Sequence, residues 1–430
     1  MAVLDVSIEM NGNQVPVGRI EGSNSTDATF TYSEEYMKSS NARQISISLP
    51  LQKEAFSVGQ TRRFFEGLLP EGFTRKSVAH YIHADETDYV TILSSLGREC
   101  LGAIRIEPQG DCSWREVEYE KLTIDRVKEL AREGATKSAL LVTQAHLSLT
   151  GASGKAGLYY DKANEEWYLP KGSAPSTHIV KQSHIRLDGI VLNEQLAMKT
   201  AENIGLDVPK CFIINVGHSR DEDILYATAR YDRKFSDKSA SVDGLTIPYR
   251  LHQEDFAQAM GISSYNKYER NREGYLRMMF DLLRNYSANP IEDQLKLWNI
   301  VIFDYLIGNT DNHLKNYSLL YDNQLKGIRL APAYDILSTS IYKDSTRDMA
   351  FHIGDRISLD EITRSSFEAA ASEVGLGTRL AMKQFDAQCQ KFKTALTDAV
   401  NELSGLGFTR AESFGRRILR TSGYRRVAAK

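Results

Sequence analysis

An aspartate and an asparagine lie five positions apart in a polar loop of this 430-residue chain. The loop, residues 307–316, reads IGNTDNHLKN and follows a long apolar segment; the two residues are Asp311 and Asn316. A carboxylate can take the proton of an attacking hydroxyl, and an amide oxygen is a hard ligand for Mg²⁺, so the pair could flank one phosphoryl group during transfer. A solvated loop with Asx turns is the alternative explanation of the same residues.

A second acid follows at a spacing that strengthens the first hypothesis. Asp335, in the sequence AYDI, lies 19 residues beyond Asn316, directly after a predicted short strand. Protein kinases place a base Asp, then a metal-binding Asn five residues on, then a metal-binding Asp after a strand. Asp335 is therefore the expected second Mg²⁺ ligand, although an ordinary turn or capping Asp is the alternative.

A lysine upstream could bind phosphates. Lys181 ends the apolar segment HIVK, which predicts a strand, and Glu194 follows 13 residues later near the start of a predicted helix. In kinases a strand lysine pairs with nucleotide phosphates and a helix glutamate orients it. The alternatives are a strand-end lysine that reaches solvent and a glutamate that is favourable near a helix start.

The turn TGASGK, residues 150–155, has two glycines and small side chains, so its backbone N–H groups could approach phosphate oxygens. It matches neither GxGxxG nor GxxxxGK[ST], and an ordinary hairpin turn explains it equally. The order of these features along the chain is the stronger argument, because it is the order found in kinases. The features are a glycine-rich hairpin, a strand Lys, a helix with Glu, an Asp–Asn loop and a strand-end Asp.

The surrounding elements are predicted from periodicity. In the first hundred residues, the alternating run 44–51 (QISISLPL) and the run 101–107 predict strands, and 62–69 predicts a helix. From residue 145 the pattern indicates an antiparallel sheet with a glycine-rich hairpin, then a helix over 193–204 that ends at Gly205. Beyond residue 253 the chain is expected to be mostly helical, most clearly over 275–286 and 292–308.

Composition limits the class of protein. The 53 Lys+Arg against 56 Asp+Glu give a net charge of -3, so no global positive field indicates nucleic-acid binding, and the four scattered Cys indicate no zinc site. The first residues lack a signal-peptide pattern, and the apolar run 298–308 is too short to cross a membrane and is interrupted by Asp304. We therefore expect a cytoplasmic protein without membrane contact.

On several motifs the sequence resembles the HipA family of bacterial serine/threonine kinases, the toxins of HipBA toxin–antitoxin modules. The N-terminal motifs are SISLPLQ, FFEGLLPEG and LGREC-LGAIRIEP, and the later motifs are LSLTGASGK, WYLPKG, THIVK, NEQLAMKTAENIGLDVP, ARYDR, IGNTDNHLKN and APAYDI. The resemblance implies an α+β, two-lobed protein-kinase-like fold related to phosphoinositide kinases. Its expected parts are a HipA-type N-terminal α+β subdomain (1–110), the remainder of the N-lobe (111–250) and a helical C-lobe (251–430).

The resemblance also implies the site. Asp311 is carried over as the catalytic base, Asn316 and Asp335 as Mg²⁺ ligands, and Ser148 as an autophosphorylation site whose phosphate switches the kinase off. The implied ATP contacts are Thr150, Gly151, Ala152, Ser153, Gly154, Lys155, Lys181, Ala229, Arg230, Tyr231, His313, Leu314, Lys315, Asn316, Tyr334 and Asp335.

The expected partners are a HipB-like helix-turn-helix antitoxin that acts as a dimer, operator DNA through that antitoxin, and a host protein substrate, expected in the translation machinery. A catalytically idle kinase-fold corepressor is the rival hypothesis, and a small-molecule or lipid kinase is a further one. Two departures from the family matter: Ala229 replaces an acidic hinge residue, and the basic segment used for DNA contact is short. The basic tail 410–430 could contact DNA in place of that segment. The alternative is that the tail is a solvated helix face.

Overall fold

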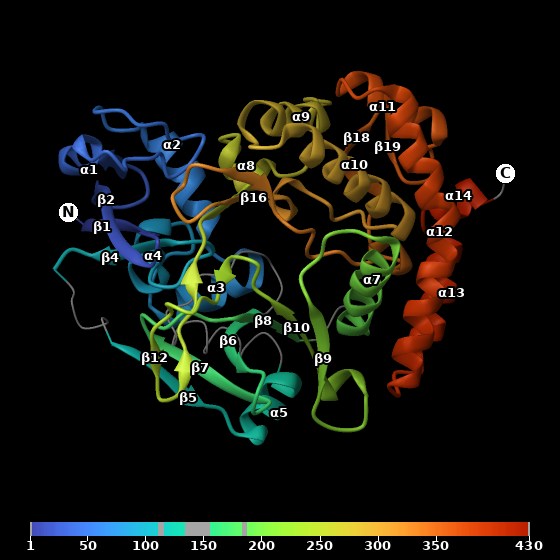
Figure 1. The fold of residues 1–430 in the computed structure, drawn as a ribbon, viewed down its shortest axis with the longest axis horizontal. Helices are drawn as coiled ribbons and strands as arrows, with labels where there is room; N and C mark the ends of the chain where they lie inside the picture. Colours follow the sequence, from blue (N-terminus) through green and yellow to red (C-terminus); the bar gives the residue numbers. More distant parts are fainter. Residues whose placement is uncertain (1, 111–115, 134–154, 183–186, 429–430) are drawn as a thin grey trace. The chain divides into compact units, whose positions relative to one another are not determined.

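The computed structural model describes residues 2–110, 116–133, 155–182 and 187–428 (Figure 1). The chain forms two compact units. Unit 1 comprises Met1–Ile185, Ile214–Ser264 and Leu319–Ile328, and unit 2 comprises Arg186–Ile213, Tyr265–Ser318 and Arg329–Lys430. The units are interleaved along the chain, so they do not follow the linear division expected from the sequence.

Unit 1 begins with a four-stranded antiparallel sheet in the order β3-β2-β1-β4. The strands are β1 (Ala2–Met10), β2 (Asn13–Gly22), β3 (Thr29–Tyr32) and β4 (Ile104–Pro108). Asn11 and Gly12 join β1 to β2 with positive φ angles of 51° and 79°, the backbone that a tight two-residue hairpin requires. The prediction of a strand near 101–107 is confirmed by β4.

Four short α-helices accompany this sheet: α1 (Glu34–Lys38), α2 (Val58–Phe65), α3 (Gly72–Tyr81) and α4 (Tyr89–Leu96). The 3₁₀ turn η1 (Glu66–Leu68) extends α2, which confirms the predicted helix over 62–69. A capping box between Ser57 and Gln60 starts α2. Phe65 then packs against Phe30 of β3, with ring centroids 5.2 Å apart.

The predicted strand over 44–51 is wrong. Only an isolated bridge between Ser46 and Leu49 forms there. Buried side chains bind this segment in place of a neighbouring strand: Glu254 accepts hydrogen bonds from the Ser46 hydroxyl (2.5 Å) and the Ile47 N–H (3.1 Å), and the Ile45 carbonyl oxygen lies 2.8 Å from Nε2 of His252. The alternation of apolar and polar residues therefore reflects these specific contacts and not a sheet.

A six-stranded sheet in the order β5-β7-β6-β8-β10-β9 follows. Its strands are β5 (Val117–Lys121), β6 (Lys155–Asp161), β7 (Glu166–Gly172), β8 (His178–Gln182), β9 (Cys211–Asn215) and β10 (Ile224–Ala229), with α5 (Ile124–Glu133) after β5. The pairs β5–β7, β6–β7, β6–β8 and β8–β10 are antiparallel, which confirms the predicted antiparallel sheet; the predicted glycine-rich hairpin falls largely outside the described residues.

Short elements complete unit 1. They are η2 (Asp221–Asp223), the strand pair β11 (Arg233–Lys234) and β14 (Tyr249–Arg250), the pair β12 (Ser241–Val242) and β13 (Leu245–Thr246), β15 (Gln253–Asp255) and α8 (Phe256–Ala259). β16 (Ser318–Tyr321) and β17 (Ile328–Leu330) lie where the chain passes between the units.

Unit 2 is mostly helical, as predicted. Its helices are α7 (Ile190–Ile204), α9 (Tyr275–Tyr286), α10 (Pro290–Ile307), α11 (Arg364–Glu373), α12 (Thr378–Gly405), α13 (Arg410–Thr421) and α14 (Tyr424–Ala428); its short elements are η3 (Ser264–Asn266), η4 (Leu314–Asn316), η5 (Thr339–Ile341), β18 (Asp348–Ile353) and β19 (Arg356–Ser358). α7 ends at Gly205 with φ 100°, as the sequence predicts, and it packs along α12 (Figure 1). Trp298 of α10 is fully buried and anchors the core.

Candidate active site

The polar loop begins where α10 ends. Gly308 closes the helix in the left-handed conformation (φ 77°), and its N–H donates to the carbonyl of Asp304 at 3.0 Å. The Asp304 carboxylate is buried and accepts hydrogen bonds from the amide of Asn309 and the hydroxyl of Tyr317, both at 2.8 Å. Burial raises the pKa of Asp304 to about 7, because these neutral donors compensate the lost hydration only in part. Asp304 thus ties both ends of the loop to α10.

A second set of contacts holds the middle of the loop. The N–H of Thr310 donates to the hydroxyl oxygen of Thr339 at 2.7 Å, and that hydroxyl donates to the Gly308 carbonyl at 3.1 Å. On the other side, the N–H of Ala350 in β18 donates to the Asn312 side chain at 3.1 Å. The loop backbone is therefore determined by segments that follow it in the chain.

Asp311 and Asn316 are the half-buried residues of the otherwise buried stretch from Asn309 to Asn316. The Asn316 amide donates to the backbone carbonyl of Asp311 at 2.7 Å, so the two lie side by side. The hydroxyl of Tyr268, an exposed residue, donates to the Asp311 carboxylate, and the Tyr268 ring packs edge-on against His313 with centroids 5.1 Å apart. The carboxylate is thus oriented by its own loop and by a distant tyrosine.

The segment that carries Asp335 is bonded to the end of the polar loop through Tyr334. The Tyr334 hydroxyl donates to the Lys315 carbonyl at 2.9 Å and lies 2.6 Å from the Ser318 hydroxyl. Asp335 itself has a φ of 58°, a left-handed conformation that is uncommon for a non-glycine residue and is often found at functional sites. Unit 2 therefore contains the Asp311–Asn316 pair and, on a segment bonded to the same loop, Asp335.

Helix α7 supports the segment that follows Asp335. The Asn193 amide donates to the Ser338 carbonyl at 3.0 Å and accepts from the Ser338 N–H at 3.1 Å. Sequence reasoning missed the supporting roles of Asn193, Asp304 and Tyr268. Of the three, only Asp304 carried a local signal, because a carboxylate inside an apolar helix is costly unless it is bound.

Unit 1 holds the predicted phosphate-binding lysines. In the register of the sheet, Lys155 of β6 pairs with Lys181 of β8, and Lys181 pairs with Tyr226 of β10, so all three side chains lie on one face. Lys155 is 9% exposed and Lys181 7% exposed, which excludes the alternative of a strand-end lysine in solvent. The Lys181 ammonium lies 5.4 Å from the centre of the Tyr226 ring. The two lysines therefore lie side by side on one face of the sheet.

The expected hinge, Ala229 to Tyr231, follows directly at the end of β10. Arg230 is buried, and its guanidinium donates to the Asp232 carboxylate at 2.7 and 2.9 Å and to Glu99 at 3.2 Å. Its side chain is therefore bound in the protein interior, and its backbone N–H donates to the Thr177 carbonyl at 2.9 Å. The Tyr231 hydroxyl donates to the side chain of Gln253.

Several expected site residues cannot be compared with the structure. Ser148 and the turn residues Thr150, Gly151, Ala152, Ser153 and Gly154 lie outside the described residues. Glu194 is buried in α7 of unit 2, whereas Lys181 belongs to unit 1, so their pairing stays a prediction.

A magnesium site here would rely on few protein ligands. Among the described residues, no group of three or more His, Cys, Asp or Glu could hold a metal ion. The Asp335 carboxylate and the Asn316 amide are oxygen donors of the kind Mg²⁺ accepts, and such sites are normally completed by nucleotide phosphates and water. The donor set therefore fits Mg²⁺ bound together with a nucleotide.

Three basic residues of the tail form contacts inside unit 2. Arg410 of α13 pairs with Asp188, Arg416 with Glu412 at 3.6 Å, and Arg417 donates to the Ile341 carbonyl at 2.5 Å. These contacts make α13 a packed helix and leave less of the tail for DNA than its composition indicates. None of the helices in the described part of the chain has the length and hydropathy to cross a membrane.

These units together make an α+β, two-lobed protein-kinase-like fold. Family models match the chain twice: the HipA N-terminal domain at residues 8–107 and the HipA-like C-terminal domain at residues 147–396. The second match alone spans more than half of the chain, and the chain belongs to the HipA family.

Relatives cover nearly the whole chain. Y4mE of Sinorhizobium fredii, a protein with a provisional kinase name, is 33% identical over 91% of both chains. The serine/threonine-protein kinase toxin HipA of Shewanella oneidensis is 25% identical over 92% of this chain and 89% of its own. A structure of the Shewanella oneidensis HipA, HipB and operator DNA complex matches with a TM-score of 0.79 at 21% identity, covering 99% of this chain and 97% of that one.

Proposed function

We propose that this protein is an ATP- and Mg²⁺-dependent serine/threonine protein kinase. The observation that supports the proposal is the Asp311–Asn316 loop, in which the two residues lie side by side, together with Asp335 on a segment that Tyr334 bonds to the same loop. An acid, an amide and a second acid, half-buried beside a buried loop, are the groups that phosphoryl transfer needs next to one another. The kinase names of the relatives support the same activity.

The substrate hydroxyl attacks the γ-phosphorus as its proton passes to the Asp311 carboxylate, and the bond from the γ-phosphorus to the bridging oxygen of ADP breaks. Asn316 and Asp335 would hold Mg²⁺, and the ion would supply positive charge that neutralises the phosphates. Lys155 and Lys181 bind phosphate oxygens, together with the turn from Thr150 to Gly154. The hinge and the residues His313, Leu314, Lys315 and Tyr334 complete the nucleotide contacts.

In biological terms, we infer a toxin of a type II toxin–antitoxin system that phosphorylates a host protein of the translation machinery. A helix-turn-helix antitoxin dimer is the proposed partner, and it joins the kinase to operator DNA in autorepression. The support is the toxin name of one relative and the complex with HipB and operator DNA that another structure contains.

Autophosphorylation of Ser148 is the proposed off switch. A phosphate adds close to two negative charges beside the phosphate-binding turn, so it repels the nucleotide.

The test is incubation of the full chain with Mg²⁺ and γ-labelled ATP, followed by intact-mass and peptide analysis. We expect label on Ser148 in the unmodified protein, none at that site in Ser148→Ala, and a loss of transfer of at least about a hundredfold in Asp311→Asn. The control is Asp344→Asn, which changes an exposed aspartate of the same unit and should keep full activity.

Full transfer by Asp311→Asn would disprove the assignment of the base. Starting protein is first checked by mass for phosphate already present. If it carries none and still takes no label, while an antitoxin binds tightly, the rival corepressor function is supported instead.

A further inference from the structure

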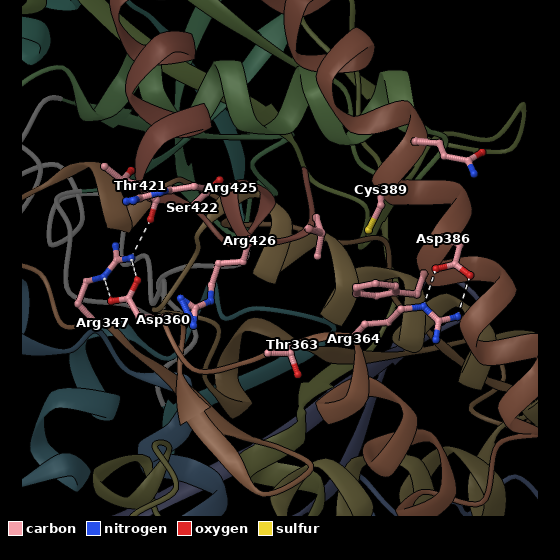
Figure 2. A pocket seen from close by; sticks show the side chains of 13 residues that line it. Arg347, Asp360, Thr363, Arg364, Asp386, Cys389, Thr421, Ser422, Arg425 and Arg426 are labelled. Atoms are coloured by element: carbon pink, nitrogen blue, oxygen red, sulfur yellow. Dashed lines mark hydrogen bonds and ion pairs between the residues drawn. The ribbon is translucent and has the colours of Figure 1, made fainter. Parts of the chain in front are cut away.

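Unit 2 contains a cavity of about 800 Å³ whose lining residues are not among those of the proposed phosphoryl-transfer site (Figure 2). It is lined by the segment from Arg347 to Arg364, by one face of α12 and by the junction of α13 and α14. A volume of this size is within the range of small-molecule sites. Its lining includes four arginines and two aspartates.

Two of the arginines are already neutralised. Arg347 donates to both carboxylate oxygens of Asp360, at 2.9 and 2.7 Å, and Arg364 donates to both oxygens of Asp386, at 3.0 and 2.9 Å (Figure 2). Such bidentate pairs fix the geometry of the guanidinium groups. They hold one wall of the cavity rigid without adding net charge.

The other two arginines give the cavity a net positive charge. Arg425 and Arg426 of α14 are exposed, and neither forms an ion pair with any residue that the structure describes. The pKa of Asp360 is lowered, first by its hydrogen bonds with Arg347 and also by the charges of Arg426 and Arg425. Arg364 also pairs with Glu368 at the edge of the cavity, so the positive charge of the lining is concentrated on Arg425 and Arg426.

A buried serine closes the inner wall of the cavity. Ser422 is 3% exposed, and its Oγ is closed to solvent and has no hydrogen-bond partner among the described residues. The polar groups that a ligand in the cavity can reach are therefore the exposed guanidinium groups of Arg425 and Arg426.

The rest of the wall is apolar. Phe385, Cys389 and Val427 line it, and burial raises the pKa of the Cys389 thiol to about 12, so this group is neutral. An apolar wall next to a cationic edge suits a ligand that carries both a hydrophobic body and a charged group. The backbone of duplex DNA is convex and fully hydrated, so it does not match such a recess.

We propose that this cavity binds a small phosphate monoester whose apolar body packs on the partly exposed Cys389 and Val427. Arg425 and Arg426 bind and neutralise the phosphate. The proposal concerns binding and does not depend on the kinase activity.

The cavity lies next to the supports of the active-site loop. The hydroxyls of Thr421 and Ser340 are 3.3 Å apart, and the Thr310 hydroxyl donates to the carbonyl of Thr346, the neighbour of Arg347, at 3.2 Å. Thr310 directly precedes Asp311. A ligand in the cavity would therefore contact residues whose direct neighbours are hydrogen-bonded to the active-site loop or to its supports.

The test is calorimetric titration of the full chain with phenyl phosphate, which carries the phosphate and an apolar ring but no nucleoside. We expect saturable binding, with phenol at least about tenfold weaker because it lacks the charged group. The double variant Arg425→Ala/Arg426→Ala should weaken binding by about tenfold or more.

The matched control is Arg416→Ala/Arg420→Ala, which removes the same charge from exposed positions of α13 outside the cavity and should bind normally. A short phosphotyrosine peptide that binds with the same dependence on Arg425 and Arg426 would support the shared chemistry and identify a protein as its source. Three outcomes overturn the proposal: no binding of phenyl phosphate, equal binding by both double variants, or binding of a DNA duplex alone through Arg425 and Arg426.

Discussion

Two buried carboxylates, Glu99 in unit 1 and Asp304 in unit 2, each organise a polar cluster, but by opposite means. Glu99 is bound by Arg230, Arg233 and Arg250, all nearly inaccessible to solvent. Asp304 is bound only by neutral amide and hydroxyl groups.

The consequence is a difference in charge state. Burial opposes ionisation of Glu99, but Arg250, Arg233 and Arg230 together outweigh it and lower its pKa. At Asp304 burial prevails and raises the pKa to about 7. A carboxylate among arginines is thus a permanent structural ion, whereas one among neutral donors titrates near neutrality. In unit 1 the ionic cluster around Glu99 fixes the structure near the expected hinge. In unit 2 the group that holds the active-site loop, Asp304, changes its protonation near neutral pH.

The largest expected effect comes from breaking the ionic cluster. Glu99→Gln leaves three buried guanidinium groups with too few acceptors, so we expect a loss of about 3–5 kcal/mol in the free energy of unfolding, measured by urea denaturation. Glu118→Gln is the control, since Glu118 forms only an exposed pair with Lys171 at 3.6 Å and should unfold like the unmodified protein. Equal behaviour of the two variants would mean that the ionic cluster is not what holds unit 1.

A smaller effect is expected at the neutral cluster. In Asp304→Asn the new amide N–H group faces the donor groups of Asn309 or Tyr317. We expect the free energy of unfolding to fall by about 1–3 kcal/mol. We also expect a lower kcat, because the loop is displaced. Both are measured on the purified variant, by urea denaturation and by transfer of labelled phosphate.

The pH dependence of this loss distinguishes the two clusters. The folded state raises the pKa of Asp304, so it binds the proton more tightly than the unfolded chain between about pH 4 and 7. The stability that Asp304 contributes is therefore complete at acid pH and is lost as pH rises to about 7. The difference in unfolding free energy between the unmodified protein and Asp304→Asn should be larger at pH 5 than at pH 8, and an opposite trend would contradict the assignment.

The smallest effect is expected at Tyr268. Tyr268→Phe removes the hydroxyl that donates to Asp311 and should lower kcat about threefold to tenfold with folding unchanged. The acid limb of the pH–rate profile should move to higher pH, because a hydrogen bond to a carboxylate favours its ionised form. Tyr286→Phe, at an exposed tyrosine of α9, is the control. A profile that does not move would mean that Tyr268 only packs against His313.

Local pattern predicted much of the fold. The helix over 275–286 matches α9 to the residue, the glycine-closed helix before Gly205 is α7, and the strand ending near Lys181 is β8. These succeeded because periodicity and capping residues act within a few positions of one another. The strand predicted over 44–51 failed because its alternation is satisfied by Glu254 and His252, about 200 positions away.

For the site, the sequence by itself determined which residue types occur and in what order: the lysine on a strand, Asp311 and Asn316 in one loop, and Asp335 after a strand. Only the tertiary structure decided that Asp304 anchors the loop, that Tyr268 reaches Asp311 across 43 positions, and that four arginines surround one cavity. The reason is physical: spacing specifies neighbours along a helix or strand, whereas the partner of a buried charge is set by packing between segments far apart in the chain.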